Sequence, residues 1–398
     1  MAAPRPREHE IAVVGARAAG AATALLAARN GHDVVVVDRA LLPSDTLSTH
    51  AIARSGVVQL QRWGLLDEVV ASGAPPIHQV TFTTPEGTMT RTVKDSAGVD
   101  FLVAPRRYVL DTIVAEAAAE AGATLRLGVT VTDLRRDASG RVTGLSGYDQ
   151  DCRAVEIEAS VVVGADGLRS RVGRSAGARM VENRGANGAA WYAYHRGPAW
   201  NGIEFSVTQD ALAGVFPTHG GEACIWICIP AASARSASRS AGSLAAGFDR
   251  LLARHAPELA ERLAGSERTS RVRGMVGLPN QVRQAWGPGW ALVGDALYHR
   301  DAITGHGISD AYRDAELLAC ALDDGLRHPG GLDRALERYR RQADAARREI
   351  FDLTCALAEF PPPGQFIQLQ RQLSAAIETE AAALAARPVP GHDRLAVA

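Results

Sequence analysis

The sequence predicts a mixed α/β (α+β) fold, in which a parallel-sheet domain is interleaved with an antiparallel-sheet domain and followed by C-terminal helices. Three observations predict it. A strand, a glycine turn, a helix and a second strand succeed one another in residues 11–38. Apolar runs also precede Gly164 and Gly294, and an aspartate follows closely after each of these glycines. Residues 186–230 contain short runs of β-branched and aromatic residues, which are typical of a sheet.

The turn after Ile11–Val14 carries most of a Rossmann-like, dinucleotide-binding fingerprint. That fingerprint has glycines at the turn and where helix packs on strand, and an acid about 20 residues later that binds a ribose. Gly15, Gly20 and Asp38 fit these positions, whereas Arg17 replaces the second glycine. We expect the Arg17 guanidinium to turn outward while its N–H group faces the phosphates, since helix N-termini favour anions. The expected dinucleotide contacts here are Gly15, Ala16, Arg17, Ala18, Ala19, Gly20, Asp38 and Arg39.

Two later segments again join glycine with an acid. The second is Ala159–Arg171, and the third is Trp290–Ala296 continued by Thr304–Ala315. With the first turn they resemble the FAD-dependent monooxygenases of the para-hydroxybenzoate hydroxylase-like (group A flavoprotein hydroxylase) family. The wider superfamily of that family includes flavin halogenases and geranylgeranyl reductases. The resemblance covers roughly residues 9–320 and rests on three motifs in the expected order.

The resemblance implies further cofactor contacts. Asp166 would belong to a segment that meets flavin and nicotinamide, Asp295 would hold the ribityl chain, and Arg107 would face the FAD phosphates or ribose. Independently, apolar residues at helical spacing predict a helix starting just after Gly305–Gly307, with free N–H groups at its start. The resemblance implies that these N–H groups face the pyrimidine edge of the flavin. Ala302 stands where the family usually has proline. The remaining expected contacts are Gly294, Gly305, His306, Gly307 and Ile308.

The expected domains are interleaved along the chain. They are an FAD-binding domain (9–72, 101–176 and 271–324), a substrate domain (73–100 and 177–270) and a helical C-terminal cap (325–398). The substrate domain would contain a hairpin over His78–Val93 and an antiparallel sheet over 186–230 that roofs the flavin. Residues 231–243, rich in alanine, serine and arginine, are expected to form a mobile loop. The cap is expected to be helical to residue 386, with a break at Pro361–Gly364.

Composition excludes several functional classes. A formal net charge of -1 argues against binding to nucleic acid or to an anionic membrane. Met1–His9 is too polar for a signal peptide, and no apolar run approaches the roughly 20 residues of a membrane span. The five cysteines include no Cys-x-x-Cys pair and predict a reducing, cytoplasmic location. Cys224 and Cys228 are interpreted as small core residues, and no metal site is expected.

The resemblance implies a monooxygenase that consumes NADPH or NADH as a transient co-substrate. O2 would add at flavin C(4a), and the hydroperoxide would hydroxylate or epoxidise a small aromatic or polycyclic metabolite. The reaction would belong to secondary metabolism. The enzyme would be a monomer or a homodimer. His50 and His299 flank flavin-binding segments and are the candidate acid–base residues, because histidine titrates near neutral pH. Tyr192 and Tyr194 would share one strand face, and Trp191 and His195 the other. The candidate substrate contacts are His50, Tyr192, Tyr194, His195, His219, Trp226, Tyr298 and His299.

Three alternatives stay open. A flavin halogenase would need a lysine near the flavin tunnel and a Trp-x-Trp-x-Ile-Pro signature. Here Lys94 is the only lysine, and Ile225 and Ile227 stand at the tryptophan positions. An alkene reductase on the same fold would need a long apolar pocket, which a sequence does not reveal. A non-catalytic FAD-binding or redox-sensing protein would oxidise no nicotinamide cofactor.

Overall fold

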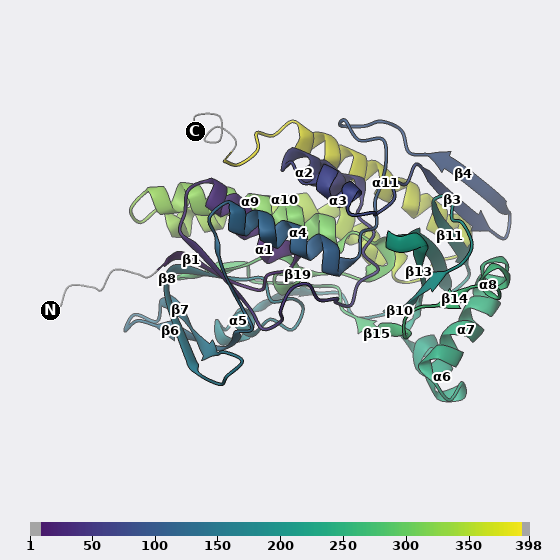
Figure 1. Cartoon of the computed structure of the whole chain (residues 1–398), viewed down its shortest axis with the longest axis horizontal. Helices are drawn as coiled ribbons and strands as arrows, with labels where there is room; N and C mark the ends of the chain where they lie inside the picture. Colours follow the sequence, from purple (N-terminus) through teal and green to yellow (C-terminus); the bar gives the residue numbers. More distant parts are fainter. Residues whose placement is uncertain (1–8, 392–398) are drawn as a thin grey trace.

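The computed structural model describes residues 9–391, arranged around two large sheets (Figure 1). In the first sheet, β1 (His9–Val14) pairs in parallel with β2 (Val34–Asp38) and with β8 (Ala154–Gly164). With α1 (Ala18–Arg29) between β1 and β2, the predicted strand–helix–strand unit is confirmed. The other strands of this sheet are β5 (Thr124–Leu127), β6 (Thr130–Arg136), β7 (Val142–Tyr148), β17 (Trp286–Gly287) and β18 (Trp290–Leu292).

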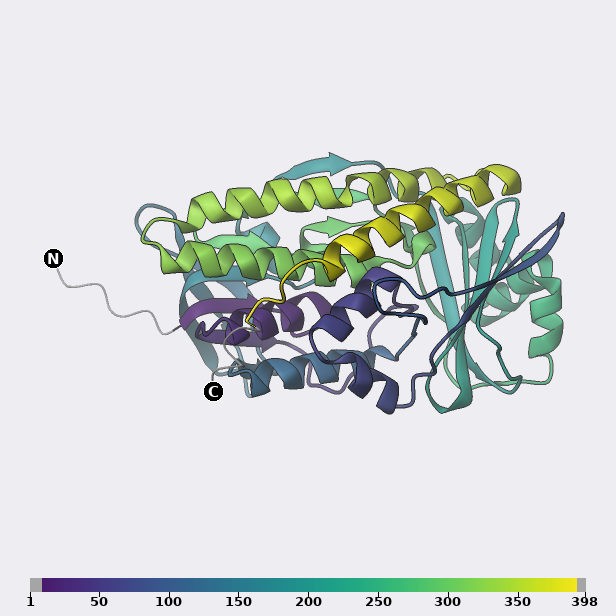
Figure 2. The same cartoon turned by 90° about the horizontal axis from the view of Figure 1, so that it is seen from above.

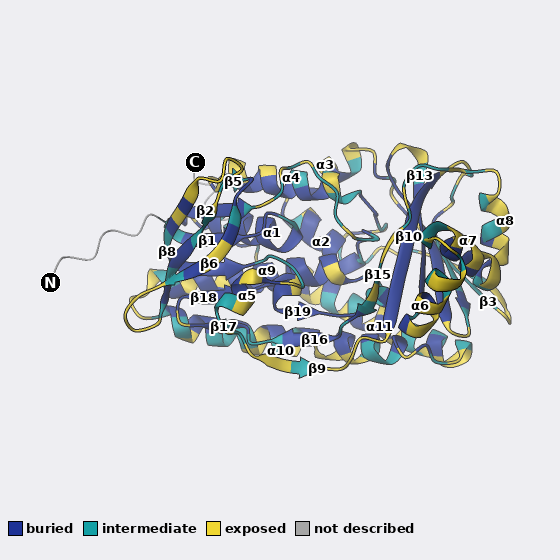
Figure 3. Ribbon diagram, turned by 90° about the horizontal axis from the view of Figure 1, so that it is seen from below, coloured by how far each residue is buried: buried dark blue, intermediate teal, exposed yellow. Residues whose placement is uncertain are grey.

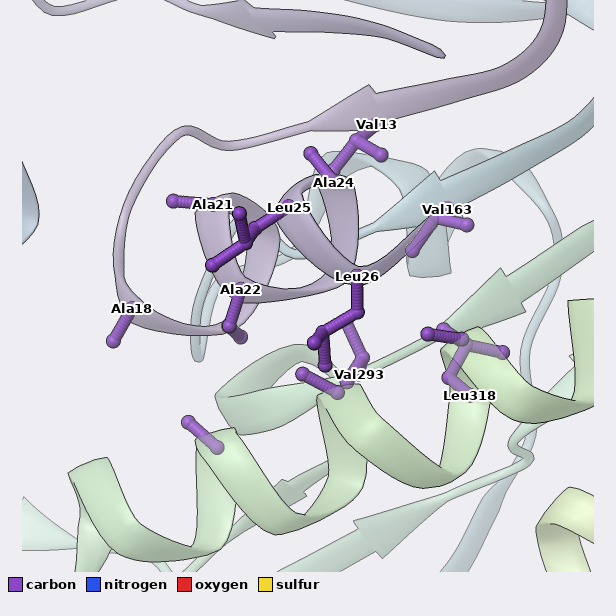
Figure 4. Close-up of a cluster of buried hydrophobic side chains, with 14 of the residues drawn as sticks. Val13, Ala18, Ala21, Ala22, Ala24, Leu25, Leu26, Val163, Val293 and Leu318 are labelled. Carbon is purple, nitrogen blue, oxygen red and sulfur yellow. The ribbon is translucent and has the colours of Figure 1, made fainter. Parts of the chain in front are cut away.

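Helices cover one face of the first sheet, and the β6–β7 hairpin lies on the other side (Figure 1). Helix α1 packs against α4 (Arg107–Glu120) and α9 (Gly307–Arg327), and α9 packs against α10 (Leu332–Leu357). Figure 4 shows Leu26 of α1 facing Val293 and Leu318, all three of them fully buried. Alanines fill much of the rest of α1, and their small side chains let the neighbouring elements approach closely. This core holds the glycine turn after β1 rigidly in place.

The second sheet contains the strands that were predicted over residues 186–230. Its hydrogen-bonded order is β14–β10–β13–β12–β11–β3–β4, with β15 also on β10. The expected hairpin and the strands of 186–230 are confirmed, but the sheet is not wholly antiparallel, because β3 runs parallel to β11. β3 enters from an earlier excursion of the chain and adds to the edge left by β11. The strands are β3 (Gln79–Thr84), β4 (Gly87–Thr92), β10 (Gly188–Arg196), β11 (Ile203–Thr208), β12 (Ala211–Pro217), β13 (Glu222–Pro230), β14 (Glu267–Arg268) and β15 (Arg273–Leu278).

Two residue ranges differ from expectation, one in its sheet and one in its secondary structure. Strand β15 lies within 271–324, the range expected for the FAD-binding domain, yet it pairs with β10 of the second sheet. The segment expected to be a mobile loop forms α6 (Ala231–Ser240), so that prediction is wrong. Ala231 and Ala234 lie buried on one side of α6, while most of its serines and arginines face solvent. The high helix propensity of alanine and this one buried stripe explain the helix.

The C-terminal part is helical, as expected, and it breaks where the prolines predict. Helix α10 ends at Leu357, and α11 (Pro363–Ala385) begins with Pro363 in its first turn. Helix α11 packs against α10 and α2 (Arg54–Arg62). It begins near the second sheet, beside the end of α10, and runs back toward the middle of the molecule (Figure 2). The last helix therefore joins the two sheets on one side of the molecule.

Short elements complete the structure. β9, β16 and β19 form a separate three-stranded sheet. Strands of the second sheet such as β10 are buried along nearly their whole length (Figure 3). None of the helices within residues 9–391 is both long and apolar enough to cross a membrane. The remaining elements are α3 (Leu66–Ala71), α5 (Arg171–Ser175), α7 (Leu244–His255), α8 (Pro257–Leu263), β9 (Met180–Asn183), β16 (Gln281–Arg283), β19 (Tyr298–His299), η1 (His219–Gly221), η2 (Gly294–Ala296) and η3 (Ala302–Thr304).

Candidate cofactor and substrate site

The first glycine turn leaves the start of α1 open to an anion. A Cβ on Gly15 would lie 2.4 Å from a neighbouring backbone oxygen, and one on Gly20 would lie 1.8 Å from the Gly15 oxygen, so only glycine fits either position. Arg17 at the N-cap makes no capping hydrogen bond, and the first turn contains no acid. In the described chain, the buried N–H groups of Ala18 and Ala19 consequently lack partners. A diphosphate fits such an end of a helix.

Asp38 lies beside this turn, at the end of β2. Its Oδ2 accepts a hydrogen bond from the backbone N–H of Ala16 at 2.8 Å, and its Oδ1 accepts one from Ala40 at 2.8 Å. The carboxylate is partly exposed, while Arg39 next to it is exposed to solvent. The structure thus brings the turn and the expected ribose-binding acid together.

Two arginines meet on one buried carboxylate nearby. The Arg17 guanidinium donates to the carbonyl of Ser44 at 2.7 Å and to Asp111 at 3.0 Å, and it does not turn outward as we expected. Arg107, the first residue of α4, grips Asp111 through Nε at 2.9 Å and Nη2 at 3.0 Å. Asp111 is fully buried, and a buried carboxylate needs such partners. Sequence reasoning missed Asp111, although its spacing of four residues from Arg107 on a helix was a usable signal.

Asp295 is an exposed residue whose neighbours in the chain are buried. It lies in η2, where Gly294 and Ala296 are buried and the Asp295 side chain is exposed. Within residues 9–391 its carboxylate accepts no hydrogen bond, and the positive charge of Arg107 is close enough to interact with it. Gly294 has φ +60°, and a Cβ there would lie 2.6 Å from Ala19 of α1. An unpaired carboxylate at this place is available to hydroxyl groups of a cofactor.

Replacing Asp295 with alanine is expected to weaken FAD binding about 10- to 100-fold, the value of a hydrogen bond to a charged group. The FAD-to-protein ratio after purification and the Kd of the apoprotein for FAD measure this. Glu258→Ala, an exposed acid on α8, is the matched control and should bind FAD as the parent does. Full retention of FAD by Asp295→Ala would remove Asp295 from the cofactor site.

The loop before α9 also leaves room for a ligand. Gly305 has φ +66°, and a Cβ added at Gly305 or Gly307 would meet no atom within 4 Å. His306, at the N-cap of α9, donates its Nδ1–H to the Thr304 carbonyl at 2.7 Å and makes no side-chain cap. Asp301 caps the preceding η3 by accepting from the Ile303 N–H at 3.0 Å. The predicted start of α9 at Gly307 is confirmed, and its N-terminus faces open space.

A buried charge cluster supports this loop from behind. Asp310 of α9 accepts from Arg300 Nε at 2.6 Å and from Arg313 Nη1 at 2.8 Å. Arg300 also donates to Thr304 in the loop and to Thr354 of α10, the latter at 3.0 Å. Arg313 pairs with Asp314 at 2.8 Å and with Glu380 of α11 at 2.9 Å. Sequence reasoning missed this cluster, because its partners come from three helices and a loop.

Asp166 has a local structural role in this structure. Its side chain accepts hydrogen bonds from Ser170 Oγ at 2.5 Å and from the N–H groups of Arg171 and Val172 at 2.5 and 3.1 Å. These contacts cap α5. The expected contact of this segment with flavin and nicotinamide stays a prediction.

A cavity of about 940 Å³ opens between the second sheet, the loop 302–306 and α11. This volume is near the upper end of the range of about 300–1,000 Å³ for small-molecule sites. Its wall is mostly apolar and aromatic and includes the residues Ile52, Phe82, Leu102, Phe205, Phe216, Trp226, Ile303, Leu373 and Ile377. Gly305 and His306 line the same space, so the cavity adjoins the expected flavin loop.

The two candidate catalytic histidines lie outside this cavity wall. His50 is buried and stacked on Tyr194, and its Nδ1–H donates to the Ala104 carbonyl at 3.1 Å. His299 donates its Nδ1–H to the Pro279 carbonyl at 2.6 Å. Thr49 and Ala51, on either side of His50, do line the cavity. Acid–base roles for both histidines therefore stay predictions without support from a contact to the cavity.

Of the expected substrate contacts, only Trp226 lines the cavity in the described chain. The strand alternation is confirmed: Tyr192 and Tyr194 belong to the buried cluster that includes Ile303, and Trp191 belongs to a separate cluster with Phe248 of α7. The other candidates, His195, His219 and Tyr298, lie elsewhere. Lys94, the only lysine of the sequence, is exposed and lines the cavity.

Buried histidines make stability depend on pH. Burial, followed by the Arg106 charge, lowers the pKa of His50 to about 3. Burial, followed by the Arg300 charge, lowers the pKa of His306 to about 4. Both side chains are neutral in the native protein at pH 5, where a histidine of the unfolded chain, with its pKa near 6.5, is protonated.

We expect the free energy of unfolding to fall as the pH is lowered from about 6.5 to about 4, because only the unfolded chain binds these protons. The slope is at most about 1.4 kcal/mol per pH unit for each histidine. Asp301 acts in the opposite direction. Burial raises its pKa to about 6, so its contribution to the free energy of unfolding is present at low pH and is lost as the pH rises through 6. Urea unfolding at pH 7, 6 and 5 measures the slope. His50→Asn, which suits the positive φ of 52°, should reduce it, and an unchanged slope would contradict this assignment.

Comparisons with known proteins identify the family of this chain. A family described as FAD binding domain matches residues 8–354. A menaquinone reductase of Mycolicibacterium smegmatis is 28% identical over 79% of this chain and 76% of its own length. Digeranylgeranylglycerophospholipid reductase 1 of Methanopyrus kandleri is 27% identical over 89% and 91%. PqsL of Pseudomonas aeruginosa, a probable FAD-dependent monooxygenase, superposes with a TM-score of 0.76 at 24% identity, over 91% of this chain and 99% of its own.

Other solved structures of this fold include flavin-dependent halogenases and a geranylgeranyl reductase-like protein. Below 25% identity these likenesses establish the fold alone. The residues described here fit FAD: α1 has an uncapped N-terminus, Asp295 is unpaired, and Gly305 and Gly307 leave space at the loop. In the described chain, no group of acidic, histidine or cysteine side chains is placed to hold a metal ion. The chain belongs to the FAD binding domain family and is an FAD-dependent oxidoreductase.

Proposed function

We propose that this enzyme acts on an extended, largely apolar molecule and reduces a carbon–carbon double bond in it. The cavity of about 940 Å³ beside the flavin loop carries the proposal. A long apolar pocket was the property that the sequence left open for an alkene reductase. An apolar substrate gains about 25 cal/mol for each Å² it buries, so a cavity of this size and lining can supply substantial binding energy.

The curated relatives support placing the reductase first. Those named above, matched over most of both chains, are reductases, and the name of one describes a lipid with geranylgeranyl chains. When bound, FAD would carry the two electrons of the reaction. The part of the protein is to orient the double bond and to exclude water. Ile303 lies on the loop expected to meet the flavin, and Phe205 and Trp226 line the same cavity.

Oxygen insertion into an aromatic or polycyclic compound is the second candidate. The aromatic rings of the cavity wall favour it, because they form one connected group. Ring centroids lie 4.9 Å apart for Phe82 and Phe205, 5.8 Å for Phe205 and Trp226, and 5.1 Å for Trp226 and Phe216. Such a surface suits a flat ring system. NADPH or NADH would be the electron source for either reaction.

One experiment separates the candidates. The FAD-loaded protein is reduced anaerobically with NADH, NADPH or dithionite and then mixed with geranylgeraniol, menaquinone or a panel of polycyclic phenols. Reoxidation of the flavin without oxygen, with a product two hydrogens heavier that has lost a double bond of its isoprenoid chain, supports the reductase; reduction of the menaquinone ring to its quinol does not. Reoxidation only after oxygen is admitted, with a product one oxygen heavier, supports the monooxygenase. Halide incorporation in a parallel sample would favour a halogenase instead, and no substrate-dependent reoxidation at all would contradict both proposals.

A further inference from the structure

The rim of the substrate cavity carries charged residues that its apolar wall does not explain. Three cationic side chains and two carboxylates line it: Arg54, Arg91, Lys94, Asp95 and Glu378. His306 also lines it but is neutral, because burial lowers its pKa to about 4. The cavity therefore has an apolar interior and an excess of one positive charge at its edge.

Arg54 is the buried member of this set. Its side chain is 6% exposed, although it is the first residue of α2 and borders the cavity. Nε donates to Glu378 at 2.7 Å, and Nη1 donates to the carbonyl of Val99. A guanidinium has five N–H donors, so these two contacts leave the others unused. Nη2 has no hydrogen-bond partner within residues 9–391 and is not among the fully buried side-chain atoms, so it keeps some exposure on a residue that lines the cavity.

The charge of Arg54 is only partly balanced. Glu378 comes from α11, is 46% exposed, and meets Arg54 through one oxygen. A partly exposed pair of this kind is weak, whereas a buried guanidinium needs several strong partners to offset its lost hydration. No acid lies in the first turn of α2, so the helix end adds a further positive field at the same place.

We propose that Arg54 binds an anionic group of the substrate, so that the substrate is an amphipathic anion with an apolar body and one carboxylate or phosphate. This inference deepens the proposed function and rests on it. The apolar body would lie against Phe205 and Trp226, and the anionic group would sit at Arg54, with Lys94 and Arg91 at the rim. The anion would share the guanidinium with Glu378 or displace it.

A purely structural ion pair makes a different prediction. If Arg54 only ties α2 to α11, removing either partner should loosen the cavity and weaken every ligand equally. If Arg54 binds an anion, the two removals act in opposite directions. Arg54→Gln removes the binding charge, whereas Glu378→Gln removes the competing carboxylate and frees the guanidinium.

The test is isothermal titration of the FAD-loaded protein with oleate, oleyl phosphate and oleyl alcohol, which share one chain and differ in the head group. The parent protein should bind at least one of the two anions about 10- to 100-fold more tightly than the alcohol. Arg54→Gln should lose that preference and keep its affinity for the alcohol. Glu378→Gln should bind the anion about 2- to 5-fold more tightly. Arg254→Gln, an exposed arginine on α7, is the matched control.

The outcomes separate this inference from the proposed function. Equal binding of all three compounds, or equal losses in both ion-pair variants, would overturn the anion site and leave the apolar cavity standing. Failure of even the alcohol to bind would count against the extended apolar substrate itself. Loss of FAD from Arg54→Gln, seen in the flavin-to-protein absorbance ratio, would assign Arg54 to the cofactor and also overturn the inference. Comparison of oleate with oleyl phosphate tells a carboxylate from a phosphate.

Discussion

Replacing Asp310 with alanine is expected to lower the free energy of unfolding by about 3–5 kcal/mol. Asp310 is 4% exposed and holds Arg300 at 2.6 Å and Arg313 at 2.8 Å. Burial alone would raise the pKa of this carboxyl, but the two guanidinium charges outweigh burial and hold the pKa below its usual value. Its removal leaves the buried guanidinium of Arg300 without a carboxylate partner, while Arg313 keeps Asp314 and Glu380. A protein that is stable by about 5–15 kcal/mol loses a large share of that margin.

Urea unfolding of the FAD-free protein at pH 7 measures this effect. Asp324→Ala is the matched control, because Asp324 lies on the same helix, is 52% exposed and pairs with Arg338. An exposed pair is worth at most about 1 kcal/mol. Arg300 also holds Thr304, so Asp310→Ala should loosen the loop and weaken FAD binding as well. Equal losses in the two variants would contradict the assignment of Asp310 as the centre of the cluster.

Local patterns predicted the part of the fold that local physics determines. The run Ile11–Val14, the glycine turn and Asp38 lie within one strand–helix–strand unit, so their arrangement follows from neighbours in sequence. The start of α9 at Gly307 and the break at Pro361–Gly364 were predictable for the same reason, since glycine and proline act on their own backbone. The loop predicted for residues 231–243 is wrong, because that prediction counts alanine with serine as a loop residue, whereas alanine is a strong helix former.

The candidate site depended more on contacts between distant parts of the chain. Arg54 meets Glu378 across 324 positions, and Arg17 meets Asp111 across 94. No spacing rule links such pairs, since each partner sits on its own helix and only the packing of the helices brings them together. The cavity was unpredictable for the same reason, because its walls come from five separate parts of the described chain, within 49–54, 80–102, 203–228, 302–306 and 370–378. His50 and His299 were chosen for their place beside motifs, which does not tell where a side chain points.

Replacing Asp111 with asparagine is also expected to cost about 3–5 kcal/mol of stability in the FAD-free protein. The fully buried carboxylate neutralises Arg17 at 3.0 Å and Arg107 at 2.9 Å, and asparagine keeps its size but not its charge. Two guanidinium groups would then lie together without an anion. Glu116→Gln, an exposed acid on the same helix, is the control and should change stability by less than about 0.5 kcal/mol.

The same variant tests whether these arginines face the cofactor. If Arg17 and Arg107 lie against the FAD diphosphate, that anion supplies part of the negative charge that Asp111 no longer provides. Saturating FAD should then raise the Tm of Asp111→Asn by more than it raises the Tm of the parent protein, because a ligand stabilises by its preference for the folded state. An equal rise in both proteins would place the two arginines away from the diphosphate and make Asp111 a purely structural anchor of α4.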